Sequence, residues 1–437
     1  MLSIIRSAWT PFILCVVLAF SYTLTQDRIE YEGGHPYDSA VYFQMANQAA
    51  AGEGLATFKP FVYRLAVPYL VGKLYPEDVL HGFDVVGVAF GILLVLFLFL
   101  FLRAYGLSRA MALWMVALYI ANPYSPFRYV LFNPANVEPA AFAFILASYW
   151  VFKKNPTLTT GSTAALIGLG CLGALVREVI LVVPLTFMGA HVLRIILRKD
   201  ARLFSQQTLC LVSILLCTVG ALVATRFMVA EATGPYETFS QMRAAFDRNW
   251  QFPEIIVLCI FTAIGPLVFV IAASLGNRSL WKFLGANIEL PIFLFGMALL
   301  SMIAGNHTDR FVFWLLPGLL PLLGHAVSQD WARLPSKKAK AWFYTPILVA
   351  QLLAYRAFVS FPPTDHETLS LPGEASLPLF LNYGEGVNLG QVTVAFMTRA
   401  NRIPLLIEFA VLAAYLLVVL FYFRRGDPAA ATPDPIA

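Results

Sequence analysis

The chain has few charged residues and few cysteines for its length. Of its 437 residues only 13% are Asp, Glu, Lys or Arg, and each of its 5 cysteines lies within an apolar stretch. This charged fraction is about half that of soluble domains, which excludes an ordinary water-soluble fold. The cysteines lack the spacing of a metal site, so we expect free thiols that pack as small apolar groups.

Two further features are missing. The sequence has no basic stripe with interleaved aromatic residues, so its formal net charge of +5 does not point to nucleic acid as a partner. Residues 21–28, which follow the first apolar run, contain no small-x-small cleavage site. We therefore expect an uncleaved first span and not a signal peptide.

Long apolar runs dominate instead: 59% of the residues are hydrophobic and the mean hydropathy is +0.72. Five runs approach or exceed the ~17–25 residues needed to cross a bilayer: 8–24, 82–102, 208–228, 255–275 and 405–423. The shorter runs are 110–121, 139–151, 163–176, 179–197, 290–304, 311–325 and 343–360. We predict an all-α, polytopic transmembrane bundle of about twelve spans, formed by a single domain over residues 1–437.

Basic residues gather in alternate gaps between these runs, which predicts an orientation. They are Arg6, Arg103, Arg109, Lys153, Lys154, Arg194, Arg198, Lys199, Arg202, Arg278, Lys282, Arg333, Lys337, Lys338, Lys340, Arg424 and Arg425. By the positive-inside rule these gaps are cytoplasmic, and so are both termini. The positive charge then faces the anionic inner leaflet, with membrane lipids as its partners.

Most of the acidic residues fall in the remaining gaps, so side chains capable of chemistry gather on the outer face. Four outer segments are long enough to hold structure: 25–81, 122–138, 229–254 and 361–404. In 229–254 the helical spacing of Phe239, Met242 and Phe246 predicts a surface helix. The segment 361–404 has little periodicity, and we expect an outer loop or lid there.

The first outer loop, residues 25–81, is predicted to hold two interfacial helices. The first begins with Asp38 as its N-cap and continues through residue 51. Its apolar face has residues at four-residue spacing: Val41, Met45 and Ala49. The second is predicted to begin at Pro60, the favoured first-turn residue. One of its sides carries Tyr63, Val67 and Leu70.

Four strings carry a resemblance to a known family: Tyr37-Asp38-Ser39-Ala40-Val41-Tyr42, Pro60-Phe61-Val62-Tyr63-Arg64-Leu65-Ala66-Val67-Pro68, Arg177-Glu178 and His307-Thr308-Asp309-Arg310. The predicted layout has one span, then a large outer loop with two interfacial helices and an acidic residue near its beginning, and then many more spans. With these strings, that layout resembles the GT-C superfamily of integral membrane glycosyltransferases. The resemblance implies transfer of a sugar from a polyprenyl-phosphate donor to a lipid, glycan or protein acceptor. It also implies the non-cytoplasmic face of a bacterial cytoplasmic membrane.

This chain departs from the resemblance at two points. Many members carry a pair of acidic residues in the first loop, whereas here Asp38 stands alone with His35 three residues before it. We therefore assign no metal ligands, and the need for a divalent cation is left open. Members also often end in a soluble outer domain, which we do not expect here.

An inverting sugar transfer needs a base for the acceptor hydroxyl, and one carboxylate can act as that base while offsetting positive charge at the anomeric carbon. We assign this role to Asp38. The leaving phosphate needs cations, and the planar guanidinium suits it well. The outer-face candidates are Arg64, Arg128, Arg177 and Arg310. The other candidate substrate-binding residues are His35, Tyr42, Glu178, His307 and Asp309.

The adjacent charges of Arg177 and Glu178 point in different directions in a helix, so they cannot neutralise one another across a turn. Because both lie at the end of an apolar run, an unpaired charge would cost several kcal/mol. We expect each to find another partner, in the protein or on a ligand.

Each candidate also has an ordinary structural explanation. Asp38 can be a plain N-cap, and Arg64 can snorkel to lipid phosphates. Arg177 and Glu178 can form a structural junction between helices. Asp309 and Arg310 can form a loop salt bridge, and His35 and His307 can be ordinary loop histidines. Tyr42 can belong to the interfacial aromatic belt, and Arg128 can be a turn residue.

A transporter or lipid flippase is the alternative function, because about twelve spans is also typical of transporters. Such proteins place ionisable residues near the bilayer midplane and have paired halves with interrupted helices. Here Asp84, Arg226 and Glu408 lie near the outer ends of their runs, and the pattern of residues 37–68 is not repeated. A non-catalytic scaffold leaves the outer carboxylates and arginines without a purpose. The sequence therefore favours the enzyme.

Overall fold

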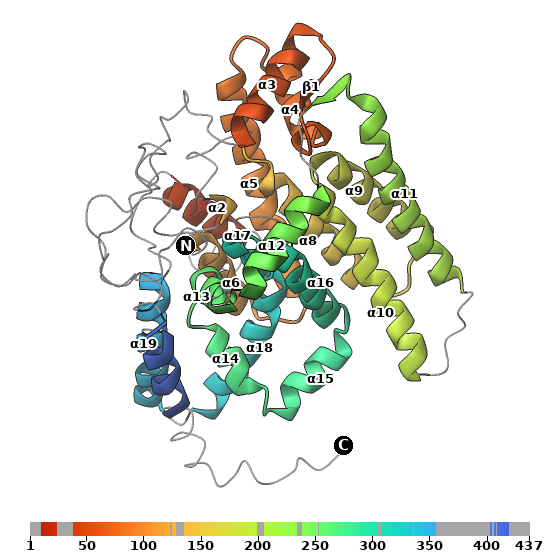
Figure 1. The fold of residues 1–437 in the computed structure, drawn as a ribbon. Coiled ribbons are helices and arrows are strands. Elements are labelled where there is room, and N and C mark those ends of the chain that lie inside the picture. The colour runs from red at the N-terminus through yellow and green to blue at the C-terminus, as the bar shows by residue number, and fades with distance from the viewer. Residues whose placement is uncertain are drawn as a thin grey trace.

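The computed structural model describes residues 10–23, 38–122, 125–127, 135–198, 205–233, 238–251, 253–303, 308–334, 336–354, 403, 406–407 and 409–418. Over these residues the chain is almost entirely helical, with one sheet of two short strands (Figure 1). The prediction of an all-α fold is confirmed.

The elements follow one another in this order: α2 (Thr10–Thr23), α3 (Asp38–Ala51), β1 (Ala56–Phe58), η2 (Phe61–Tyr63), α4 (Ala66–Leu74), α5 (Val79–Ala104), α6 (Arg109–Ala121), α8 (Glu138–Lys154), α9 (Thr160–Val176), η3 (Glu178–Leu181), α10 (Val182–Arg198), α11 (Gln206–Met228), β2 (Glu231–Thr233), α12 (Thr238–Gln251), α13 (Pro253–Ile264), α14 (Val268–Ser274), α15 (Arg278–Ala286), α16 (Glu289–Ile303), α17 (Thr308–Phe313), α18 (Leu316–Arg333) and α19 (Lys337–Ala354). A further short helix covers Phe409–Val418.

Three stretches are long and apolar enough to cross a membrane: Val79–Ala104, Glu178–Leu197 and Gln206–Met228. The pair α15 and α16 would add a fourth, although the two helices are bent by 89° relative to each other. Shorter apolar helices include Arg109–Ala121 and Thr160–Val176. Length and composition of the described helices thus fit a membrane protein, but they do not confirm about twelve spans.

The predicted span over residues 255–275 is interrupted. Gly265, with a φ of +79°, separates α13 from α14, and Pro266 follows it. The buried Gln351 of α19 satisfies the backbone groups that the break frees. Its amide nitrogen donates to the Ile264 carbonyl at 2.9 Å, and its oxygen accepts from the Leu267 N–H at 3.1 Å. Irregular backbone in an apolar environment needs such partners.

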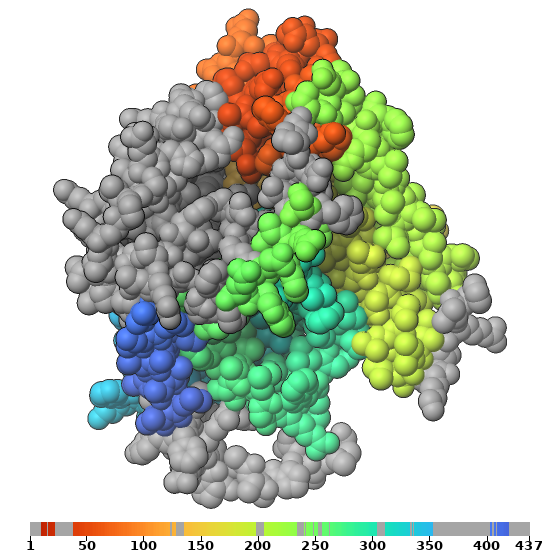
Figure 2. Space-filling model, viewed as in Figure 1, coloured from red at the N-terminus to blue at the C-terminus, as the bar shows by residue number. Residues whose placement is uncertain are grey.

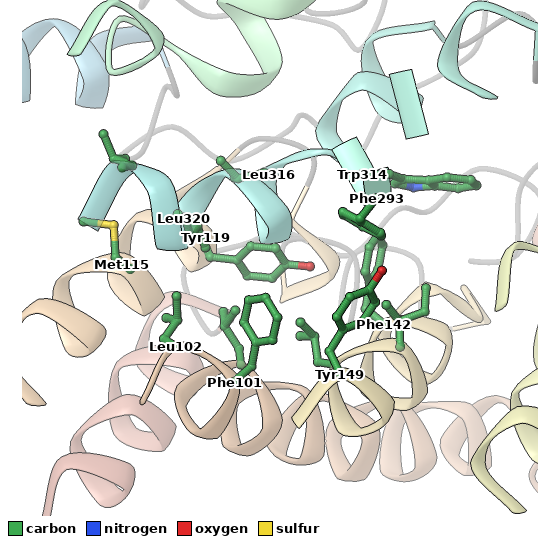
Figure 3. Close-up of a cluster of buried hydrophobic side chains, with 14 of the residues drawn as sticks. Phe101, Leu102, Met115, Tyr119, Phe142, Tyr149, Phe293, Trp314, Leu316 and Leu320 are labelled. Carbon is green, nitrogen blue, oxygen red and sulfur yellow. The ribbon is translucent and has the colours of Figure 1, made fainter. Parts of the chain in front are cut away.

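Aromatic side chains fill the core where α5, α6, α8, α16 and α18 meet (Figure 3). Tyr149 of α8 packs edge-on against Phe187 and Phe293, with ring centroids 5.0 and 5.3 Å apart. Tyr119 of α6 lies 5.2 Å from Phe313. Tyr149 therefore packs α8 against both α10 and α16.

Between residues 38 and 78, in the segment predicted to be the first outer loop, the structure has two α-helices, but the second begins later than predicted. Pro60 starts only the short 3-10 turn η2, and α4 begins at Ala66. The turn ends at Arg64, whose ψ of 59° interrupts the helical path. Leu70 is consequently exposed, whereas Val67 and Val71 face the core.

Helix α3 matches the prediction in its bounds, and it packs closely on α4 at Gly72. A Cβ atom on Gly72 would lie 2.1 Å from the Ala46 carbonyl oxygen and 2.9 Å from the Ala49 Cβ. The buried face of α3 includes Tyr42, Met45, Ala46 and Ala49. Most of this face therefore packs on protein.

A parallel strand pair ties this region to the end of α11. Residues 56–58 of β1 pair with residues 231–233 of β2, and the Ala230 N–H donates to the Leu55 carbonyl at 2.8 Å. Figure 2 shows α3 and α4, in red and orange, beside the light green end of α11. We call this the α3/α4 end of the bundle, and the opposite end in Figure 1 the α15 end.

Three helix termini meet around one buried carboxylate at the α15 end. Glu289, in the first turn of α16, is fully buried and accepts hydrogen bonds from three side chains. Lys153 of α8 donates at 2.9 Å, Arg194 of α10 at 2.7 Å and the Tyr105 hydroxyl at 3.2 Å. The dipoles of α16 and α8 favour these signs of charge, because Glu289 lies in the first turn of α16 and Lys153 in the last turn of α8.

We predict that Glu289→Gln destabilises the protein by roughly 2–4 kcal/mol, because it leaves two cations at a largely buried site without a counter-charge. The apparent melting temperature of the purified protein in detergent should fall. Adding Lys153→Met to this variant should recover part of the loss. Glu53→Gln is the control, since that side chain is exposed. A Glu289→Gln variant as stable as the control would contradict the role of this cluster.

A second prediction concerns the contact between α3 and α4. Gly72→Ala should cost about 1–3 kcal/mol, because the added methyl group overlaps the backbone of α3. Gly168→Ala in α9 is the matched control, since a Cβ there meets no atom within 4 Å. It should be neutral or stabilising, because alanine is the better helix former. Equal melting temperatures for the two variants would disprove the close packing at Gly72.

Candidate functional site

A cavity of about 640 Å³ is lined by residues of α9, η3, α10 and α11 and by residues of α16 and α17, with Trp314 just after α17. Its charged lining residues lie at the α3/α4 end: Arg64, Arg177, Glu178 and Arg226. Its walls are mostly apolar and include Val182, Leu185, Leu222, Ile292, Phe295, Leu299 and Leu300. Met242 places α12 at its edge. The cavity therefore has a cationic end and a long apolar side.

Arg64 joins the segment between α3 and α4 to η3. Its Nε donates to Glu178 Oε2 at 2.9 Å, its Nη2 donates to Glu178 Oε1, and its Nη1 donates to the Tyr42 hydroxyl at 3.0 Å. The guanidinium carbon also lies 5.1 Å from the Phe61 ring centroid. Such a two-pronged arginine–carboxylate pair is among the stronger hydrogen-bonded contacts in proteins. The N–H donors of Arg64 therefore point at side chains of the protein.

Arg177 forms a second pair, in which both side chains are buried. Its Nη1 donates to Glu138 Oε1 at 2.8 Å, and the exposed fractions of the two side chains are 5% and 1%. The guanidinium carbon lies 4.6 Å from the Trp314 ring centroid. Arg177 follows α9 in extended conformation, and Glu138 begins α8. The expectation that Arg177 and Glu178 each find a different partner is confirmed.

Arg64, Arg177 and Asp38 all influence the pKa of the Tyr42 phenol. Burial raises the pKa of the Tyr42 phenol, the charge of Arg64 opposes that rise, Asp38 adds to it, and Arg177 opposes it. For Arg64, burial disfavours the charge, but Glu178 and Tyr42 outweigh it and raise the pKa of the guanidinium. The phenol is therefore neutral and Arg64 is charged at neutral pH.

Asp38 lies at the margin of this site. It is in the first turn of α3, half-buried, and one turn before Tyr42. Residues four apart share a helix face, so the carboxylate and the phenol lie on the same side of α3. Asp38 is not among the residues that line the cavity, and it forms no ion pair with another described residue. Tyr42 and Glu178 thus bond Arg64 directly, and Asp38 lies one turn before Tyr42 on α3.

Five predicted site residues are not placed by the structure. His35, Arg128 and His307 lie outside the described residues. Asp309 and Arg310 belong to α17, but their side chains also lie outside the described part. Within that part, no group of three or more His, Cys, Asp or Glu residues is suited to a metal ion.

The structure adds residues that sequence reasoning did not select. Arg226 lines the cavity, and its guanidinium carbon lies 3.2 Å from the Tyr63 ring centroid. The sequence did not mark Glu138 as a site residue, because an acidic residue before an apolar run is typical of any helix start. Trp314 carries a buried indole N–H that has no hydrogen-bond partner among the described residues. Of these three residues, only Arg226 could have been found from the sequence, because it is a charged residue at the end of an apolar run.

No protein-family model matches this chain, and no curated protein matches it. The likeness to membrane glycosyltransferases therefore rests on the general layout and on the short strings given above.

Proposed function

We propose that this protein is a GT-C-like, inverting membrane glycosyltransferase that uses a polyprenyl-phosphate-linked sugar as its donor. The observation that supports the proposal best is the cavity, because it combines guanidinium groups at one end with a long apolar side. A lipid phosphate has the same two parts. The acceptor is a hydroxyl group of a lipid, glycan or protein.

The length of the apolar wall fits a lipid chain. Along α16 the lining residues extend from Ile292 to Ile303, which at 1.5 Å per residue is about 16 Å. This is about half of a ~30 Å hydrocarbon core. Several wall residues are also exposed, including Leu185, Phe295 and Leu299 at 54%, 68% and 49%. An isoprenoid chain could therefore enter sideways from one leaflet.

The proposed membrane orientation is supported by the two ends of α8. Glu138 at its start belongs to the cavity end, and Lys153 in its last turn belongs to the Glu289 cluster. Along the helix these residues are about 22 Å apart, which is about three quarters of a ~30 Å hydrocarbon core. We place the Glu289 cluster at the cytoplasmic boundary and the cavity's charged end at the outer boundary. About twelve spans and cytoplasmic termini complete the proposal.

In the proposed reaction the Asp38 carboxylate takes the proton of the acceptor hydroxyl. The acceptor oxygen forms a bond to the anomeric carbon while the bond from that carbon to the phosphate oxygen breaks. The lipid phosphate leaves with the bonding electrons, and the positive charge at the cavity end stabilises it. Because attack occurs opposite to the leaving group, the configuration is inverted. A divalent cation forms no part of this proposal.

A transporter or lipid flippase is the second candidate, and one observation favours it. The break at Gly265 between α13 and α14 is an interrupted helix, a feature that the sequence did not predict and that transporters use at their binding sites. Here, however, Gln351 bonds the Ile264 carbonyl and the Leu267 N–H at this break. The enzyme remains our proposal.

We predict that Asp38→Asn lowers sugar transfer at least ~10²-fold, because the variant lacks the general base. Transfer from polyprenyl-phosphate sugars should be measured with protein in liposomes, alongside the melting temperature, which should not change. Asp247→Asn is the control, since that side chain is exposed on α12.

Full transfer activity in Asp38→Asn would remove Asp38 as the base. A transporter would behave differently, because sealed vesicles would accumulate substrate and uptake would survive the Asp38→Asn change. That result would replace the enzyme with the second candidate.

A further inference from the structure

The charged lining residues of the cavity differ in whether they already have partners. Arg64 is bonded to Glu178 and Tyr42, and Arg177 is bonded to Glu138. Arg64 uses three of its five N–H donors in these bonds, and Arg177 shares its charge with the buried Glu138 carboxylate. Both arginines therefore have structural tasks that compete with phosphate binding.

Arg226 is different. It lines the same cavity, its side chain is exposed, and it forms no ion pair with any residue in the described part of the chain. Its guanidinium carbon lies 3.2 Å from the centroid of the Tyr63 ring. Stacking on an aromatic face leaves the edge of the guanidinium, and hence its N–H donors, available to an anion.

The orientation of α11 argues against simple snorkelling of Arg226 to the lipid surface. Leu222, Thr225 and Arg226 all line the cavity and lie on one face of the helix. Val223 and Phe227 are 52% and 83% exposed on the other side. Arg226 therefore faces the cavity, one helical turn after the apolar wall residue Leu222.

The position of Tyr63 under Arg226 depends on the tertiary fold. Strand β1 pairs with β2, which directly follows α11, and the Lys59 N–H donates to the Thr233 carbonyl at 3.0 Å. This pairing holds the η2 turn against the end of α11. The η2 turn and the end of α11, which are far apart in the sequence, thus hold Arg226 at the cavity together.

We infer that Arg226, held by Tyr63, is the residue that binds the phosphate of a polyprenyl phosphate whose chain lies along α10, α11 and α16. This rests on the proposed function for the choice of lipid. The anion contacts the guanidinium edge, and the isoprenoid chain covers Leu222, Leu185 and Phe295. Arg64 and Arg177 shape the cavity and do not bind the phosphate directly.

The test is binding of radiolabelled farnesyl phosphate to the full-length protein in phosphatidylcholine nanodiscs. Arg226→Gln should weaken binding at least tenfold, and Tyr63→Leu should weaken it several-fold, because the guanidinium loses its support. Arg243→Gln is the control, since Arg243 is exposed on α12 and should leave binding unchanged. Melting temperatures of all variants should match the wild type.

Competition distinguishes the sources of the phosphate. Farnesyl phosphate should compete well, whereas inorganic phosphate and phosphatidylglycerol should compete at least tenfold less well. Equal competition by inorganic phosphate would overturn the role of the apolar wall, and equal competition by phosphatidylglycerol would overturn the choice of a prenyl chain.

Wild-type affinity in Arg226→Gln would overturn the inference and leave the proposed sugar transfer untouched. Failure of the proposed function has a different signature, namely no sugar transfer by a protein that still binds farnesyl phosphate through Arg226. Absence of binding to the wild-type protein would overturn the inference together with the polyprenyl donor.

Discussion

Charges buried in an apolar bundle must be neutralised by partners, and in this protein the partners come from different helices. Each buried carboxylate would cost several kcal/mol if left alone. Glu138 meets Arg177 from the end of α9, and Glu289 meets Lys153 and Arg194 from the ends of α8 and α10. Helix α8 is consequently held by ion pairs at both of its ends. The aromatic core around Tyr149 packs between these two fixed points.

The cavity depends on this arrangement. Two of its walls are α10 and α16, and both helices are joined at the α15 end through Glu289. At the α3/α4 end Arg177 and Glu178 separate rather than pair with each other, and each reaches outward to Glu138 or to Arg64. The helices are therefore tied at their ends while the space between them is lined by apolar side chains. A bundle fixed in this way can hold an open cavity without collapse of its walls.

Sequence patterns predicted the all-α class, the bounds of α3 and the separate partners of Arg177 and Glu178, because these follow from local periodicity and from the cost of a lone charge. They could not identify the partners themselves. Arg177 bonds Glu138 across 39 positions, and Arg64 bonds Glu178 across 114. The start of α4 was wrong because Pro60 suits either a helix or a 3-10 turn. The Gly265 break was missed because Gln351, which satisfies it, lies 84 residues beyond Leu267.

Structural and ligand-binding arginines look alike in a sequence, but they differ in the contacts that hold their guanidinium groups. A guanidinium that contributes to the fold has its donors on carboxylates of the protein, as Arg64 does. A guanidinium kept for a ligand should instead be held by contacts that leave its hydrogen-bonding edge open, and the face of an aromatic ring is such a contact. Arg226 on Tyr63 meets this condition, and the strand pair β1–β2 provides the geometry. The first outer loop thus contributes to the cavity through a ring as well as through charged groups.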